Sequence, residues 1–284
     1  MAKEKLMKIK KQLLISLSIF VILSSFMTML FISCSNENKD SIIVKIGHVG
    51  ESDRAIWKPI QEKLSKEGIT VELVSFADYS MPNQALNDGD IDLNAFQHHA
   101  YFYNETNTKG YNLSIIGLTF ISAMNIYSQK ISNVNEVKRG DKIAIPNDPS
   151  NGGRALKVLE AAGLIKLKNN APDNPEVSDI GQNPLNLEII EVDAGGIYRL
   201  LPDVACAVIN CNYALDFGLN PGEDFIFQDN PKIYNNNMYI NLIASRTEDK
   251  DNEIYKKIAD AYHSPEVEKV YAEEFKGAYL PAWK

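Results

Sequence analysis

The sequence has few of the residues on which metal and thiol chemistry depend. Only three cysteines and four histidines occur among its 284 residues. It also lacks the short motifs of common enzyme classes, with no Gly-x-Ser-x-Gly, no His-Glu-x-x-His and no glycine-rich phosphate loop. These absences weigh against an enzyme, and we predict a protein without catalysis. An esterase-like hydrolase is the enzyme class that stays open as an alternative.

Positive charge is scarce as well. The chain carries 29 Lys and Arg against 37 Asp and Glu, which gives a formal net charge of −8. A protein that binds nucleic acid needs a basic surface to meet the phosphates. We therefore predict no nucleic acid partner.

One long hydrophobic run occurs, at the start of the chain. Five lysines precede an uncharged stretch from Leu13 to Ile32, which ends at Ser33 and Cys34. This order is typical of an export signal, and the segment Phe31–Cys34 resembles a relaxed lipobox. We predict a lipoprotein signal peptide at residues 1–33, lipidation at Cys34 and a tether at 34–40. The run could instead remain as a membrane anchor, and in either case the body lies in the cell envelope, outside the cytoplasmic membrane.

The rest of the chain is acidic and of moderate length. The first 34 residues include five of the 29 basic and one of the 37 acidic side chains, so about 250 residues with a net charge near −12 remain. That length can form two modest lobes or one large domain. No later apolar run reaches membrane length, so we expect the body to be tethered only at its front.

Two cysteines remain in the body, Cys206 and Cys211. If Val204–Asn210 is a strand, their Cα atoms lie about 16 Å apart along it. Disulfides join Cα atoms less than about 7 Å apart. We therefore predict two buried free thiols and no metal site built from both.

Strand and helix patterns alternate along the body, which predicts parallel sheets. The predicted strands are Ser41–Gly50, Ile69–Phe76, Asp90–Phe96, Leu113–Ser128, Lys142–Pro146, Leu187–Val192, Val204–Asn210 and Met238–Ser245. The predicted helices are Trp57–Lys66, Pro82–Leu86, His99–Thr106, Ala155–Ala162, Glu253–His263 and Pro265–Phe275, the last with Ser264 as its N-cap. Residues 168–184 hold three prolines and predict a loop.

Two such series followed by a late strand predict an α/β fold with two lobes. Residues 41–126 and 239–284 would form lobe 1, and residues 127–238 would form lobe 2. In open α/β sheets, ligands bind beyond the carboxyl ends of the strands. The distinctive side chains at these predicted ends are Tyr79, Phe96, His98, Tyr101, Arg154 and Asn210.

Arg154 is the most informative of these residues. We predict that it starts a helix, where the helix dipole disfavours a cation. Its guanidinium could bind a ligand carboxylate through two parallel hydrogen bonds, or it could be an ordinary solvated arginine. Asn210 and Asn241 each adjoin an apolar run, so they either satisfy backbone groups across the sheet or receive an ammonium group.

The histidines and aromatic residues could also have purely structural roles. Tyr and Phe near strand ends often pack in a core. His98 and His99 are adjacent, so their side chains point in different directions and cannot easily chelate one ion. Nothing in the spacing gathers His48 and His263 beside them. We predict no metal site and no cofactor.

Six blocks of sequence resemble one known family. They are VELVSFADYSMPNQAL, GDIDLNAFQHHAYF, AIPNDPSNGGRAL, GLIKLK, AVINCNYA and YINLIASR, in this order between Val71 and Arg246. They resemble the methionine-binding lipoproteins of ABC importers, the MetQ or NlpA family, over essentially the whole body. The resemblance implies a two-lobed periplasmic-binding-protein fold, type II-like, with the ligand in the interlobe cleft. It also implies delivery of an amino acid to an ABC permease that has an ATPase on its inner side.

Carried over by position, the resemblance implies a role for each candidate residue. Arg154 would hold the α-carboxylate, and Asn210 and Asn241 would bind the amino and carboxylate ends. The thioether side chain would be enclosed by Tyr79, Phe96, His98 and Tyr101. Polarizable walls of this kind suit sulfur, and His98 would act as a neutral wall member. His99 stands where the family often has lysine and would face outward.

Two departures from the family pattern leave the ligand open. The segment "NGGR" replaces the more usual single glycine before Arg154, and "DAGGIYRLL" (Asp193–Leu201) replaces a proline-containing segment. L-methionine is the expected ligand, with D-methionine, a methionine-containing dipeptide or another small apolar amino acid as alternatives. Two rival functions also remain: a metal-binding receptor or adhesin built around the histidine pair, and a surface lipoprotein that acts through its exterior.

Overall fold

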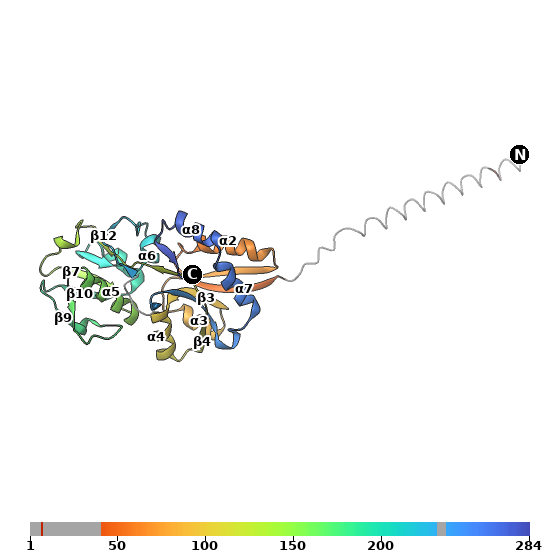
Figure 1. The fold of residues 1–284 in the computed structure, drawn as a ribbon, viewed down its shortest axis with the longest axis horizontal. Coiled ribbons are helices and arrows are strands. Elements are labelled where there is room, and N and C mark those ends of the chain that lie inside the picture. The colour runs from red at the N-terminus through yellow and green to blue at the C-terminus, as the bar shows by residue number, and fades with distance from the viewer. Residues whose placement is uncertain (1–6, 8–40, 232–236) are drawn as a thin grey trace. The chain divides into compact units, whose positions relative to one another are not determined.

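The computed structural model describes Met7, residues 41–231 and residues 237–284 (Figure 1). The predicted signal peptide, apart from Met7, the lipidation at Cys34 and the tether fall outside these residues. Ile42–Lys284 form one compact unit. Within the described part of the chain, no helix is both long and apolar enough to cross a bilayer.

The first sheet has the strand order β2-β1-β3-β13-β4. Its central part is parallel, because β1 (Ile42–Val49) pairs with β2 (Ile69–Phe76) on one side and β3 (Leu93–His98) on the other. The antiparallel part is β13 (Asn241–Arg246) between β3 and β4 (Leu113–Leu118). Helices α2 (Arg54–Ser65) and α3 (Pro82–Asp88) connect β1 to β2 and β2 to β3. The strand order therefore reverses beside β1, which opens a space at the carboxyl ends of the strands.

The second sheet repeats this arrangement with the order β10-β7-β11-β6-β12. Strand β7 (Lys142–Pro146) runs parallel to its two neighbours, β10 (Glu188–Val192) and β11 (Cys206–Val208). Strand β6 (Ile126–Tyr127) is antiparallel to both β11 and β12 (Phe225–Phe227). Helix α5 (Pro149–Ala161) follows β7, and α6 (Cys211–Asp216) follows β11; both lie beside this sheet in Figure 1. The predicted α/β fold is thus confirmed.

The remaining elements flank the two sheets. The helices are α4 (His99–Lys109), α7 (Glu253–Tyr262) and α8 (Pro265–Glu273), with 3-10 turns at Val134–Glu136, Val177–Asp179, Ala194–Leu200 and Thr247–Asp249. Short strand pairs are formed by β5 (Phe120–Ser122) with β14 (Tyr279–Pro281) and by β8 (Lys166–Leu167) with β9 (Ile180–Gln182). The first sheet draws its strands from residues 42–118 and 241–246, and the second from 126–227. The lobe boundaries given above stay a prediction.

Each sheet has a hydrophobic core against its helices. Helix α2 buries Ile56, Trp57, Ile60 and Leu64, the helical spacing that places side chains on one face. This face packs on β2, α7 and α8. A third cluster contains Val49 from β1 together with Tyr127 and Ala144 of the second sheet, so the apolar packing is continuous between the two sheets.

Most predicted elements are confirmed within a few residues, but the run Leu113–Ser128 is not one strand. It forms β4, β5 and β6, which belong to three different sheets. The three strands are all mainly apolar, and hydrophobicity alone does not show where a chain passes from one sheet to another. The predicted loop at 168–184 contains the short strand β9. The predicted strand Val204–Asn210 is shorter in the structure, where it consists of β11 alone. Strand β14 was not predicted.

Helix α5 begins earlier than predicted, and this changes the position of Arg154. Asp148 is the N-cap, its side chain accepts a hydrogen bond from Asn151 N, and Pro149 is the first helical residue. Arg154 is therefore the sixth residue of the helix. The two glycines before it meet close backbone, since a Cβ on Gly152 would lie 2.7 Å from Pro146 O and one on Gly153 2.9 Å from the Cα of Asn174. The segment that we predicted to precede the helix is a tightly packed helical turn.

Cys206 and Cys211 are both free and buried, which confirms the prediction of two free thiols. Burial raises the pKa of each thiol to about 12. The neutral thiol is therefore the form present at neutral pH, and it is a poor nucleophile.

A buried amide network ties α3 to β3. Asn83 Nδ2 donates to Gln97 Oε1 at 2.8 Å, and Asn83 Oδ1 accepts from both Asn94 Nδ2 (2.9 Å) and Gln97 Nε2 (2.6 Å). All three side chains are buried, so each amide depends on the others for its hydrogen bonds.

We expect Asn83→Ala to lower the free energy of unfolding by about 3 kcal/mol, because it leaves buried amide groups of Asn94 and Gln97 without their partner. Urea unfolding measures the change. The matched control is Gln84→Ala, the exposed neighbour on α3, which should change stability by less than about 0.5 kcal/mol. Equal effects of the two substitutions would contradict the assignment.

Candidate ligand-binding site

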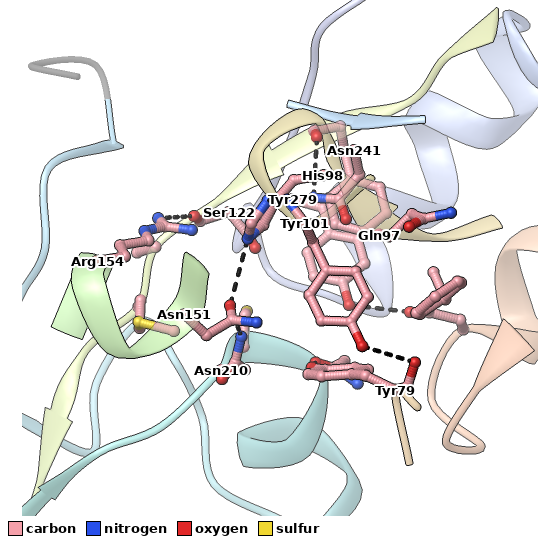
Figure 2. Close-up of a pocket in the computed structure, with 17 residues that line it drawn as sticks. Tyr79, Gln97, His98, Tyr101, Ser122, Asn151, Arg154, Asn210, Asn241 and Tyr279 are labelled. Carbon is pink, nitrogen blue, oxygen red and sulfur yellow. Dashed lines mark hydrogen bonds between the residues drawn. The ribbon is translucent and has the colours of Figure 1, made fainter. Parts of the chain in front are cut away.

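All seven side chains predicted for the site line one pocket (Figure 2). They are Tyr79, Phe96, His98, Tyr101, Arg154, Asn210 and Asn241. The pocket lies where the carboxyl ends of β2 and β3 from the first sheet face those of β7 and β11 from the second. The prediction that strand ends gather these residues is confirmed, while their roles toward a ligand stay predictions.

The two sheets contribute different chemistry to the pocket. Tyr79 follows β2, Phe96 and His98 belong to the end of β3, and Tyr101 lies in the first turn of α4. Arg154 projects from α5, drawn in green in Figure 2, and Asn210 lies between β11 and α6. The first sheet thus supplies mainly aromatic walls, and the second supplies the cation and an amide.

Arg154 is a buried cation with several fixed partners. Its Nη2 donates to Ser122 O at 2.6 Å and to Asp229 Oδ2 at 2.9 Å, and the side chains of Arg154 and Asp229 are only 4% and 2% exposed. The guanidinium carbon also lies 4.5 Å from the centre of the Tyr239 ring, a cation–π contact. The alternative of an ordinary solvated arginine is therefore wrong.

Asn151, which the sequence reading missed, links the two sheets at the pocket. Its Oδ1 accepts from Asn210 Nδ2 at 2.7 Å and lies 3.3 Å from His98 Nε2. Its Nδ2 donates to Asp148, the cap of α5, at 3.0 Å. With its amide nitrogen committed to Asn151, Asn210 keeps its Oδ1 buried and without a partner among the described residues. A buried acceptor of this kind needs a donor from a ligand or water.

His98 is held as a neutral ring in one tautomer. Its Nδ1 accepts from Tyr101 N at 3.2 Å, so the proton resides on Nε2, which donates to Asn151 Oδ1. Burial, with a further contribution from the Arg154 charge, lowers the pKa of His98 to about 3. His98 is therefore an uncharged wall of the pocket at neutral pH.

The aromatic residues form a connected wall. The ring centres of Tyr79, Phe96 and Tyr101 lie 5.8 to 6.0 Å apart in pairs. Tyr101 OH donates to Tyr79 O at 2.8 Å, and Tyr79 OH donates to Asn212 Oδ1 at 2.6 Å. Burial raises the pKa of both tyrosines, so they stay neutral donors. The ring faces of this wall are apolar, and the hydroxyl groups of both tyrosines have hydrogen-bond acceptors within the protein.

Asn241 and His99 complete the comparison with the predicted residues. Asn241 pairs with His98 across β3 and β13, and its Nδ2 donates to Phe120 O at 3.3 Å. It therefore satisfies a backbone group, as one of its two predicted readings stated, and also lines the pocket. His99 is half-buried, packs against Tyr103 and does not line the pocket. Among the described residues, no three His, Cys, Asp or Glu side chains come together as a metal site.

Several polar lining residues were not predicted. They are Asp53, Gln97, Ser122, Asn151, Asn212 and Tyr279. Asp53 follows the end of β1, and the argument from strand ends could have found it. Tyr279 and Ser122 come from the short β14 and β5 pair, which carries no sequence signal of its own.

Two α/β sheets whose strand ends meet at one pocket are the architecture of periplasmic binding proteins, and comparison with known proteins agrees. The chain belongs to the NlpA lipoprotein family, whose sequence profile matches residues 44–283. This confirms the family inferred from the six sequence blocks.

Relatives with known names and structures are similar over nearly their whole length. The D-methionine-binding lipoprotein MetQ of Escherichia coli K12 is 40% identical over 89% of this chain and 93% of its own. A crystal structure of a nutrient-binding protein from Burkholderia cenocepacia bound to methionine is 41% identical, with a TM-score of 0.79 over 84% of this chain and 99% of its own. The substrate-binding protein of a methionine transporter from Streptococcus pneumoniae is 35% identical, with a TM-score of 0.80 over 85% and 96%.

We expect the His98 imidazole to remain neutral, with its proton on Nε2, from pH 8 down to about pH 4. Nitrogen-15 NMR of the ring measures both the tautomer and the titration. Because the folded pKa lies below the unfolded value of about 6.5, the unfolded state binds the proton first, and this site costs about 1.4 kcal/mol of stability per pH unit as the pH falls from 6.5 toward 3. A ring that titrates above about pH 5 would contradict the assignment.

Proposed function

We propose that this protein is the lipid-anchored substrate-binding component of an ABC importer, and that it binds methionine, L-methionine foremost, between two lobes. It would deliver the amino acid to the permease and carry out no reaction of its own. The observation that carries the proposal is Asn210 Oδ1, buried and without a partner among the described residues, in a pocket that also holds Arg154 and an aromatic wall. An amino acid supplies what each part needs: an ammonium donor, a carboxylate and an apolar side chain.

The polar residues of the pocket suit the ammonium and carboxylate groups of an amino acid. The ammonium group would donate to Asn210 Oδ1, which Asn151 aims by holding the amide nitrogen. The carboxylate would join the guanidinium of Arg154, whose position Asp229 and Ser122 already fix. A preorganised charged group adds affinity because little entropy is lost when the ligand arrives. The thioether would pack on Tyr79, Phe96 and Tyr101, since aromatic faces attract sulfur.

Import is supported by the relatives rather than by the pocket. One similar protein is named a D-methionine-binding lipoprotein, and another is named the substrate-binding protein of a methionine transporter. The predicted lipid at Cys34 would keep the receptor beside a membrane permease and its ATPase. Lipid attachment, the permease and the preference for L-methionine are all parts of this proposal.

We expect L-methionine to bind with a dissociation constant in the micromolar range or below, and methioninol, which lacks the carboxylate, to bind about 100-fold more weakly. Two charge-assisted hydrogen bonds to Arg154 account for that difference. Calorimetry on the full-length protein in mild detergent measures both, with D-methionine and a methionine dipeptide as competitors. Mass spectrometry of the small molecules released on denaturation provides a second measure. No heat with L-methionine and no amino acid released would refute the proposal.

Contacts between α6 and the first sheet would hold the pocket closed. Asp216 Oδ1 accepts from Glu51 N at 3.2 Å and from Ser52 N at 2.8 Å. Beside them, Tyr213 OH donates to Ala77 O at 3.4 Å. Gly50 has a positive φ of 82°, and a Cβ there would lie 2.0 Å from Asp216 Oδ2, so the approach of the carboxylate requires glycine.

We expect Asp216→Ala to speed methionine dissociation about 3- to 10-fold, because two hydrogen bonds that keep the pocket closed are lost. Stopped-flow displacement measures the rate. Asp203→Ala, at an exposed carboxylate in the same half of the chain, is the control and should leave the rate unchanged. If both variants release methionine at the wild-type rate, α6 does not hold the pocket closed.

A further inference from the structure

Asp53 is the only acidic side chain among the described residues that line the pocket, just as Arg154 is the only basic one. It lies four residues beyond the end of β1 and is 5% exposed. A carboxylate this deeply buried in a ligand pocket needs an explanation, because burial of an ion without a partner is costly.

The side chain of Asp53 also avoids its most favourable local position. Asp53 is the N-cap residue of α2, where a carboxylate ordinarily accepts hydrogen bonds from the first backbone N–H groups and gains from the helix dipole. Here the side chain makes no capping bond. Its Oδ1 instead accepts from Tyr279 OH at 2.9 Å, and Tyr279 is itself a pocket residue. The carboxyl group is therefore directed toward the pocket rather than toward its own helix.

In the part of the chain that the structure describes, no cation interacts with this carboxyl group. The ionisable groups that interact with it are Asp216 and Cys211 of α6, Tyr79 beyond β2, Tyr262 of α7, Tyr271 of α8 and Tyr279 of β14. All of these are acids, so none supplies a positive charge. The neighbouring Arg54 is paired with Glu51 on the surface. Among the described residues, the counter-ion of Asp53 is missing from the protein itself.

We propose that Asp53 is a further ligand-binding residue, which supplies the anionic partner of the ligand's ammonium group together with the amide oxygen of Asn210. This inference rests on the proposed function and makes it more specific. Asp53 and Asn210 line the same pocket, and each has a carboxyl or amide oxygen to offer to an ammonium group. The site then selects zwitterions: Arg154 receives one charge of the ligand and Asp53 the other.

The assignment makes affinity depend on pH in a defined direction. Burial raises the pKa of Asp53 to about 7, and the like charge of Asp216 adds to the shift. A bound ammonium group favours the ionised carboxylate, so a proton leaves Asp53 for solvent when methionine binds near or below pH 7. The free protein thus holds more protons than the complex, and affinity falls as the pH drops below 7, by up to about tenfold per pH unit.

No other pocket group titrates in the same window. The pKa of His98 is lowered to about 3, that of Cys211 is raised to about 12, and the buried tyrosines lie above their ordinary range. A pH dependence between 5 and 8 is therefore a property of Asp53.

The test compares two ligands on the full-length protein in mild detergent by calorimetry from pH 5 to pH 8. L-methionine should bind at least tenfold more weakly at pH 5.5 than at pH 8. The probe 4-(methylthio)butanoate has the carboxylate and thioether but no ammonium group, and its affinity should not fall on acidification. This comparison needs no substitution and therefore does not depend on the folding of a variant.

Two variants sharpen the test. Asp53→Asn keeps an acceptor for Tyr279 OH but carries no charge, so methionine should bind it at least tenfold more weakly at pH 8 and with a flat pH profile. Tyr279→Phe removes the hydrogen bond that lowers the pKa of Asp53, so the fall in affinity should begin at higher pH. Asp203→Asn, at an exposed site, should retain the wild-type profile.

The outcomes separate this inference from the proposed function. Methionine affinity that is flat between pH 5 and pH 8, or that rises as the pH falls, would overturn the role of Asp53 while leaving methionine binding intact. Equal acid sensitivity of methionine and the probe would overturn it as well. Absence of methionine binding at pH 8 would instead refute the proposed function.

Discussion

The buried charge of Arg154 constrains the structure around the pocket more than any other group. A guanidinium excluded from water needs an anion and hydrogen-bond acceptors at fixed positions. Asp229, the carbonyl of Ser122 and the ring of Tyr239 provide them, and these residues come from distant parts of the chain. Once Arg154 is buried, the segments that carry its partners have little freedom to lie elsewhere. The same constraint gives the pocket a fixed positive end.

Apart from Arg154 and Asp53, the pocket is lined by neutral groups whose hydrogen bonds are almost all made within the protein. His98 is neutral, Tyr79 and Tyr101 have acceptors for their hydroxyl groups, and Asn151 orients both His98 and Asn210. In such surroundings the few unsatisfied atoms carry the most information, because a low dielectric makes an unpaired polar group costly. In the proposed function, a bound ligand would supply the hydrogen bonds that these atoms lack, and the contacts of α6 with Glu51 and Ser52 would keep the pocket closed.

Much of this could be read from the sequence, since strand ends and helix signals are local. The strand Ile69–Phe76 was predicted to the residue, and the side chains that the argument from strand ends selected line one pocket. The start of α5 was missed although Asp148 and Pro149 form a cap signature, and two glycines, which are poor helix formers, separate that signature from the predicted start at Ala155. The run Leu113–Ser128 was misread because a continuous apolar pattern does not reveal a change of sheet.

The sequence by itself determined the α/β class, the family and which residues stand at strand ends, because periodicity, caps and ordered motif blocks are properties of short segments. Only the tertiary structure decided which groups share an environment. That Asn151 holds Asn210, that Asp229 pairs with Arg154 and that Asp53 turns from its helix to Tyr279 all depend on contacts between residues 59 to 226 positions apart. Burial and pairing set the charge state of each group, and neither can be read from a residue's neighbours in the chain.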